Sequence, residues 1–251
     1  MKQLFTTVLL AALTFFAMAQ ERRNPAFQLN GNFQVGIPLD DFRANLNKEA
    51  FGGGLLFVAH IGDSPVALGA ELSLMGYESE SARYSMRVAG FVRDYEARTS
   101  SNILLGHAVM RFQPALHFPI RPYLDGLVGF KNLFTSTSLT DTSLGEQIDS
   151  GTDLSDWAFS YGGAFGLQIA FSKRADVVLD LRCAYLLGAN ARYLVRAPDP
   201  LGGFNYNDPI EAFEQKSSST NLLLPQIGVT FRGLFTKTNS SATTPDYYDF
   251  R

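Results

Sequence analysis

Hydrophobic and polar residues alternate along the chain from about residue 26, with a period of two. This period is typical of β-strands whose two faces lie in different environments. Within 157–171, large apolar side chains occupy one face, whereas Ala, Ser, Gly and one Gln occupy the other. The same pattern predicts eight strands, at residues 26–37, 51–61, 66–77, 102–113, 122–134, 157–171, 175–187 and 221–235.

The predicted connections alternate between long and short. The long polar ones span 38–50, 78–101, 135–156 and 188–220, and the short ones span 62–65, 114–121 and 172–174. An even number of strands, with long loops at one end and tight turns at the other, is the pattern of outer-membrane barrels. We therefore predict an all-β fold, an eight-stranded antiparallel up-and-down transmembrane β-barrel, with long loops outside the cell and both mature termini at the periplasmic end.

Composition decides which face of each strand meets lipid. A strand face exposed to water would carry long charged side chains, but the polar face of 157–171 carries only small residues and one Gln. Small side chains suit the narrow interior of an eight-stranded barrel. A soluble barrel with the apolar face inside is the alternative. We expect the apolar faces to contact lipid, and small and ionic residues to fill the lumen.

The alternation also directs charged residues into the lumen. Six of them lie at similar depth, and we expect them to form a lumenal salt-bridge network, since an unpaired charge in a narrow interior costs several kcal/mol. The six are Glu71, Arg111, Asp125, Asp180, Arg182 and Arg232. Lys131 points inward on the same pattern. The alternative is that some of these groups lie near turns and are solvated. A plugged lumen of this width argues against a general porin.

The N-terminus has the pattern of a secretory signal peptide. Lys2 precedes the apolar run 4–16, and Ala17 and Ala19 fit a small-x-small cleavage pattern with Gln20 as the new N-terminus. We predict a signal peptide at 1–19, a barrel at 20–235 and a flexible polar tail at 236–251. Cys183 is the only cysteine, so it cannot form an intrachain disulfide. The net charge of −3 offers no basic surface for nucleic acid.

Three segments resemble the small outer-membrane β-barrel superfamily, of the OmpA-barrel and OmpX kind. They are FQLNGNFQVGIP at 27–38, RPYLDGLVGFKN at 121–132 and LPQIGVTFRGLF at 224–235. The last resembles the C-terminal assembly signal of this superfamily, with Gln226, Gly228, Phe231 and Phe235 in its positions, although a tail follows it. The resemblance implies the outer membrane of a Gram-negative bacterium, export through the periplasm, and the barrel-assembly machinery and outer-membrane lipid as partners.

Candidate chemistry is sparse. His60 and His107 are predicted to face the lumen, and His117 to lie in a periplasmic turn. Some barrels of this superfamily are lipid A-modifying hydrolases, and His60 with Ser73 or Glu71 is a conceivable triad. All three histidines are directed away from lipid, so packing in the lumen is the competing interpretation, and we expect no enzyme. The acidic segment 140–156, with Asp141, Glu146, Asp149, Asp153 and Asp156, could bind a divalent cation, but it lacks the spacing of an EF-hand loop, and a solvated acidic loop is the favoured interpretation. We expect no metal site and no cofactor.

The sequence therefore predicts a non-enzymatic outer-membrane barrel that anchors four surface loops, with a structural, adhesion or recognition role. The last of these loops is long enough to bind an extracellular ligand. A narrow transport pore and a lipid A-modifying hydrolase are the alternatives. The sequence does not choose among the non-enzymatic roles.

Overall fold

The structure is a computed structural model that describes residues 25–62, 64–88, 91–115, 118–142, 146–171, 176–197, 210 and 213–232. Its elements are β1 (Phe27–Pro38), α2 (Asp40–Leu46), β2 (Ala50–His60), β3 (Val66–Val88), β4 (Phe91–Phe112), β5 (Ile120–Asp141), β6 (Glu146–Ile169), β7 (Val177–Gly188), β8 (Asn190–Arg196), β9 (Phe213–Ser219) and β10 (Leu222–Arg232). None of the helices among the described residues has the length and apolar character needed to cross a membrane.

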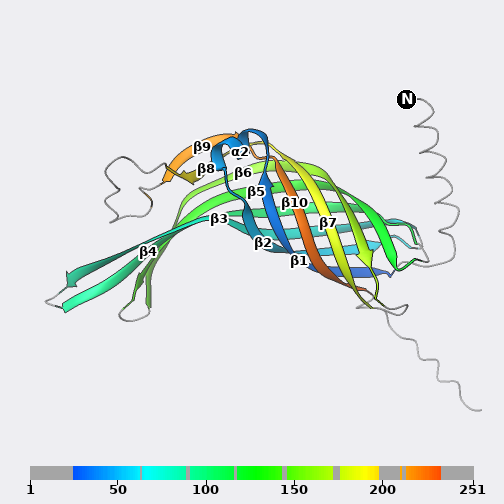
Figure 1. Cartoon of the computed structure of the whole chain (residues 1–251), viewed down its shortest axis with the longest axis horizontal. Helices are drawn as coiled ribbons and strands as arrows, with labels where there is room; N and C mark the ends of the chain where they lie inside the picture. Colours follow the sequence, from blue (N-terminus) through cyan, green and yellow to red (C-terminus); the bar gives the residue numbers. More distant parts are fainter. Residues whose placement is uncertain are drawn as a thin grey trace, which may run out of the picture.

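Eight of the strands close into one antiparallel barrel in the order β1-β10-β7-β6-β5-β4-β3-β2 (Figure 1). The first and last strands complete the ring, with Leu29 opposite Phe231 and Phe33 opposite Ile227. The predicted eight-stranded antiparallel up-and-down barrel is therefore confirmed. β8 and β9 pair with each other in a separate two-stranded sheet.

The outer wall of the barrel is apolar. Large side chains such as Leu55, Phe165 and Trp157 stand exposed on it, at 61%, 50% and 60% of their full surface, whereas Gln34 and Thr230 on the opposite faces are fully buried. Water would not wet such a continuous apolar wall favourably, whereas hydrocarbon does. The apolar faces are thus the lipid-facing ones, and the alternative of a soluble barrel with a hydrophobic interior is excluded.

Four barrel strands are much longer than the apolar alternation indicated. The segments 78–101 and 135–156, predicted as loops, are largely strand, because β3, β4, β5 and β6 continue pairing far beyond the membrane band. The alternation ends where the outer face becomes polar, but Thr and Tyr still favour extended backbone. The result is a four-stranded sheet that projects from the barrel toward the outside (Figure 1).

The other two predicted loops also contain regular structure. Residues 38–50 include α2, and residues 188–220 include the hairpin of β8 and β9. Phe42 from α2 and Tyr193 from β8 are both buried, and their rings meet edge to face at 5.0 Å. We call α2, β8 and β9 together the cap, because Figure 1 shows them over one side of the extracellular end of the barrel.

The interior of the barrel has two layers, and only one was expected. The periplasmic half holds the polar and ionic side chains. The extracellular half holds large apolar ones that continue into the cap, and its members include Leu56, Met75, Ile103, Leu105, Leu133, Leu186, Leu222 and Leu224. The expectation of a lumen filled throughout by small and ionic residues is therefore wrong for this half. The cap shields these side chains from water, which makes an apolar interior favourable there.

Candidate functional site

Charged side chains from four strands meet in the periplasmic half of the lumen. Arg111 on β4 donates to both carboxylate oxygens of Asp125 on β5, at 2.8 and 2.9 Å. Arg182 on β7 donates to both oxygens of Glu71 on β3, at 2.8 and 3.0 Å. The Nε of Arg182 also lies 3.0 Å from Asp125 Oδ2, an ion-pair contact without hydrogen-bond geometry. These four residues form one chain of alternating charge, which we call the ionic layer.

The two remaining charges of the predicted network have other neighbours. Asp180 accepts hydrogen bonds from Tyr123 at 2.5 Å, from Thr230 at 2.8 Å and from Gln168 at 3.1 Å, all neutral donors. Arg232 donates to Gln168 at 2.8 Å. Tyr123 also lies under Arg111, whose guanidinium carbon is 3.7 Å from the ring centroid. Neutral polar side chains therefore link Asp180 and Arg232 to the rest of the layer.

Three glutamines close the lumen in a ring that sequence patterns did not reveal. Gln28 donates to Gln113, Gln113 donates to Gln168, and Gln168 donates back to Gln28, each at 2.9 Å. Because they come from β1, β6 and the residue that follows β4, the ring crosses the whole lumen. Gln28 and Gln168 lie on the inward side of their strands, Gln113 continues the inward parity of β4, and that parity is readable in the sequence. Their mutual contact is not, since it depends on the stagger between distant strands.

The histidines lie inside the barrel. His107 Nε2 on β4 is 2.9 Å from Ser160 Oγ on β6, over Gly129 of the intervening strand β5, and both side chains are buried. The other conceivable pairing does not form: neither ring nitrogen of His60, nor Ser73 Oγ, has a hydrogen-bond partner among the described residues. His117 lies outside the described residues. The His107–Ser160 pair has the contact of a base with a nucleophile, but it faces the filled lumen, away from the lipid-facing wall.

A buried lysine joins the barrel to the cap. Lys131 on β5 is fully buried and donates to the backbone carbonyl of Thr220, which links β9 to β10. The next residue, Asn221, accepts from the backbone N–H of Gly188 at 3.0 Å and donates to Asp40 at 2.9 Å. One short linker therefore contacts β5, the end of β7 and the start of α2. These contacts hold the cap against the barrel.

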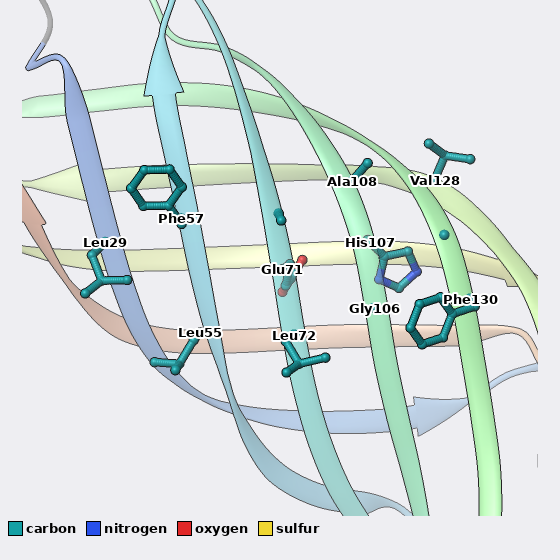
Figure 2. A pocket seen from close by; sticks show the side chains of 12 residues that line it. Leu29, Leu55, Phe57, Glu71, Leu72, Gly106, His107, Ala108, Val128 and Phe130 are labelled. Atoms are coloured by element: carbon teal, nitrogen blue, oxygen red, sulfur yellow. The ribbon is translucent and has the colours of Figure 1, made fainter.

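The lipid-facing wall carries a shallow groove of about 650 Å³ across β1 to β5 (Figure 2). Small residues, Ala70, Gly106 and Ala108, are part of its lining, and Phe57 and Phe130 stand beside it. The Phe130 ring lies over Gly106, where a Cβ atom would come within 2.4 Å of it. The surface of the groove is almost wholly apolar, so hydrocarbon fits it. Glu71 and His107 also line it, but both side chains are buried.

The projecting sheet has an open edge. β2 pairs with β3 only as far as Gly76, opposite Phe51, whereas β3 continues to pair with β4 up to Val88. A bulge at Gly76/Glu78 marks the point where β2 leaves. The backbone of residues 78–88 therefore has no strand partner on its second side among the described elements. Edges of this length are ready templates for another strand. This one carries the charged residues Glu78, Glu80, Arg83 and Arg87 but contains no Pro that would remove a backbone donor.

The acidic hairpin of β5 and β6 does not gather its carboxylates. Asp153 accepts from Thr137 at 2.7 Å, whereas Asp156 accepts from the backbone N–H of Arg192 at 2.8 Å. Asp149 is exposed and Asp141 is buried. Within the described part of the chain, no three His, Cys, Asp or Glu side chains come close enough together to hold a metal ion. Cys183 stands exposed on the lipid-facing wall.

Part of the sequence similar to an assembly signal lies in β10. Gln226 points inward and donates to Gln34 at 2.9 Å, and it accepts from Arg182 at 2.8 Å. Gly228 faces Asn32 on β1, and Phe231 is exposed to lipid. Phe235, the expected cleavage site at Ala17, Ala19 and Gln20, and the expected tail at 236–251 lie outside the described residues. Recognition by the assembly machinery therefore stays a prediction.

Comparison with known proteins found no matching family model and no similar curated protein. Several solved structures do match. Neisserial surface protein A is 10% identical over 84% of this chain and 99% of that chain, with a TM-score of 0.42. The attachment invasion locus protein Ail of Yersinia pestis, solved with the heparin analogue sucrose octasulfate, is 12% identical over the same shares, with a TM-score of 0.37.

A major outer membrane protein of Thermus thermophilus is 13% identical over 82% of this chain and 99% of that chain, with a TM-score of 0.31. These likenesses are too distant to assign a role. The closed eight-stranded ring and its apolar exterior are themselves the architecture of outer-membrane proteins. The chain is an outer-membrane β-barrel.

Proposed function

We propose that this protein is a non-enzymatic surface-recognition protein, in which a closed barrel anchors the projecting sheet of β3–β6 and its open edge binds an extended segment of an extracellular protein. The observation that carries this proposal is the unpaired backbone of residues 78–88. An added strand would form main-chain hydrogen bonds along that edge, and side chains would supply specificity.

The interior supports anchoring rather than transport or catalysis. The glutamine ring, the ionic layer and the apolar layer follow one another along the lumen, and Gln168, Arg111 and Leu222 within them are each at most 1% exposed. A solute would have to displace all three. The His107–Ser160 pair lies inside the same filled interior. A pore and a lipid A-modifying hydrolase are therefore the less favoured functions.

The test is peptide selection on the full chain in lipid nanodiscs, with a display library of random twelve-residue peptides as the probe. A variant with residues 80–99 and residues 137–151 each replaced by an Asn-Gly turn keeps the barrel, lacks the β3 edge and bares no new edge on β5. Selected peptides should bind the wild type and not this variant, and they should slow amide hydrogen exchange at 78–88. Equal binding to both proteins, or no change in exchange at the edge, would contradict the proposal.

Two adjacent proline variants sharpen the test. The N–H groups of Ser81 and Ala82 point to opposite sides of β3, so only one of them faces β4. Proline at the position whose N–H faces β4 disrupts the hairpin. Proline at the position whose N–H faces the open edge removes a donor from that edge alone. One of Ser81→Pro and Ala82→Pro should therefore keep the hairpin and still lose peptide binding.

A further inference from the structure

The outer face of the projecting sheet continues the lipid-facing wall without a break. On β4, every second side chain faces outward, from Met110 and Ala108 in the membrane band to Arg98 and Glu96 beyond it. β5 follows the same course from Leu124 to Thr140. The four strands therefore present one uninterrupted surface to whatever surrounds the barrel, first to hydrocarbon and then to the layer above it.

The chemistry of this surface changes at one level on three neighbouring strands. Gly76, Asn102 and Phe134 are paired in one row, and they form the upper limit of the apolar band. The next outward row is Ser79, Ser100 and Ser136, again paired with one another. Thr152 on β6 lies in the same row, opposite Ser136. Above this row, outward hydroxyl groups are interspersed with the charged side chains of β3 and β4, and the hydroxyl-bearing residues include Ser81, Ser138, Thr140 and Ser150.

The height of this hydroxyl face matches the headgroup layer. A strand tilted by about 45° gains roughly 2.4 Å of height per residue, so Arg98 stands on the order of 10 Å above Asn102. The polar layer of a phospholipid bilayer adds only about 5–8 Å on each side of the hydrocarbon core, and sugar-bearing lipids extend further. The rows from Ser100 to Arg98 therefore lie among lipid headgroups rather than in bulk water.

The sheet also leans in the matching direction. Figure 1 shows the β3–β4 hairpin inclined away from the side that carries α2, β8 and β9. A wall that leans outward turns its outer face toward the membrane surface. The cap does not cover this face, because its contacts are with the inner one: Tyr77 bonds to the carbonyl of Leu194, and Arg196 pairs with Glu80.

The side chains of the outer face suit neutral polyhydroxyl groups. Arg83 and Glu96 pair at 3.0 Å, so their charges offset each other. Ser85 donates to Asp94 at 2.5 Å, and Arg98 donates to Ser79 at 3.2 Å. Among the described side chains of this face above Ser100, the charged ones are Arg83, Arg98, Asp94 and Glu96, which add up to no net charge. The face therefore offers hydroxyl donors and acceptors with balanced charge, as a layer of sugar hydroxyls requires.

We propose that the outer face of the β3–β6 sheet is a docking surface for the saccharide headgroups of an outer-leaflet glycolipid. The lipid-facing groove and apolar band hold the acyl chains, and the serine and threonine rows directly above hydrogen-bond the sugars. This surface is distinct from the open edge of β3, so either assignment can fail without the other.

The first experiment measures how strongly the membrane shields labelled positions from a water-soluble quencher, in the full chain carrying Cys183→Ser. A bimane label is placed on Ser100→Cys or Ser138→Cys on the outer face, or on Asp149→Cys, which is exposed and pairs with Leu139 on the inner face of the same sheet. Acrylamide quenching is compared in phospholipid vesicles and in vesicles that also contain lipopolysaccharide. Outer-face quenching should fall about threefold with lipopolysaccharide, whereas quenching at Asp149→Cys should not change. Equal quenching of the outer-face labels in both membranes would overturn the proposal.

The second experiment asks whether the hydroxyl groups cause the contact. Lipopolysaccharide should raise the unfolding temperature of the wild type, and Ser100→Ala/Ser138→Ala should lose most of that rise. Glu214→Ala/Lys216→Ala on β9 is the control and should keep it. A rise that survives the serine variant overturns the proposal. The delipidated core oligosaccharide is also added, at equal sugar concentration, to the protein in phospholipid vesicles. If it raises the unfolding temperature as much as lipopolysaccharide does, the ligand is a free glycan, and the assignment of the surface to a membrane glycolipid is wrong.

Discussion

Arg182 holds the ionic layer together, because its guanidinium contacts two carboxylates from different strands. It bonds both oxygens of Glu71 and lies beside Asp125, and its side chain is 3% exposed. Bidentate contacts of this kind need a planar fork, so lysine would not replace it. Lys48 and Glu78 make a pair of similar length outside the membrane, but half of the Lys48 side chain is exposed. The two ion pairs therefore differ in burial more than in the distance between their charged atoms.

Removing the Arg182 cation should strongly destabilise the barrel. Arg182→Met leaves Glu71 and Asp125 with less compensation, and breaking a buried pair costs about 3–5 kcal/mol. Urea unfolding in lipid vesicles measures the loss. Lys48→Met is the matched control, and it should cost less than about 1 kcal/mol because exposed pairs contribute little. Arg182→Met/Glu71→Gln should recover part of the loss. If Arg182→Met and Lys48→Met lowered the free energy of unfolding by similar amounts, the ionic layer would not stabilise the fold.

At the scale of elements, the cap depends on a linker of two residues. The backbone carbonyl of Thr220 accepts a hydrogen bond from Lys131, and the Asn221 side chain bonds both Gly188 and Asp40. α2 has seven residues and is too short to be stable alone. Its place therefore comes from Phe42 packing against Tyr193 and from the Asn221 contacts. The cap is one unit, and its parts should open together.

Asn221→Ala should loosen this unit without unfolding the barrel. The variant loses two side-chain hydrogen bonds, each worth about 1 kcal/mol, so the open state of the cap should become roughly 5- to 30-fold more populated. Trypsin cleavage at Arg192, Arg196 and Lys216 in the cap hairpin measures this directly. Ser64→Ala, in a periplasmic turn, serves as the control. An unchanged cleavage rate at the three sites would show that the linker does not hold the cap.

At the scale of the whole molecule, three internal layers close the lumen, and the cap covers its extracellular end. The glutamine ring and ionic layer fill the periplasmic half, the apolar layer fills the extracellular half, and the cap covers it. A barrel of eight strands has room for little besides its own side chains. The layers close the lumen independently, since different side chains from different depths form each one.

The whole protein should therefore be silent in planar lipid bilayers, even without its cap. A variant in which a short Gly-Ser turn replaces residues 190–219 should show no steady conductance, because the ionic and apolar layers remain. Its unfolding midpoint should fall, since Tyr193 and Val195 no longer cover the apolar layer. A general porin measured in the same chamber is the positive control. Steady openings of the wild type would contradict the closed lumen.

The sequence by itself determined the number of barrel strands, their antiparallel order and the side of each strand that meets lipid. Those properties follow from a period of two, which is local, and from turn residues at regular intervals. Inward parity also selected Glu71, Arg111, Asp125 and Arg182 as lumenal. Their ion pairs join positions up to 111 residues apart, so no local pattern could assign the partners.

Only the tertiary structure decided how far the strands extend and what fills the lumen. Beyond the membrane band the outer face is polar, so the periodic signal disappears, although pairing between β3 and β4 continues to Val88. The glutamine ring depends on the stagger of three separated strands. The apolar upper layer is stable only because the cap excludes water from it, and the cap comes from segments far apart in the chain, Asp40–Leu46 and Asn190–Arg196. Closure of the barrel, which brings these segments together, is the physical reason why local sequence could not reveal them.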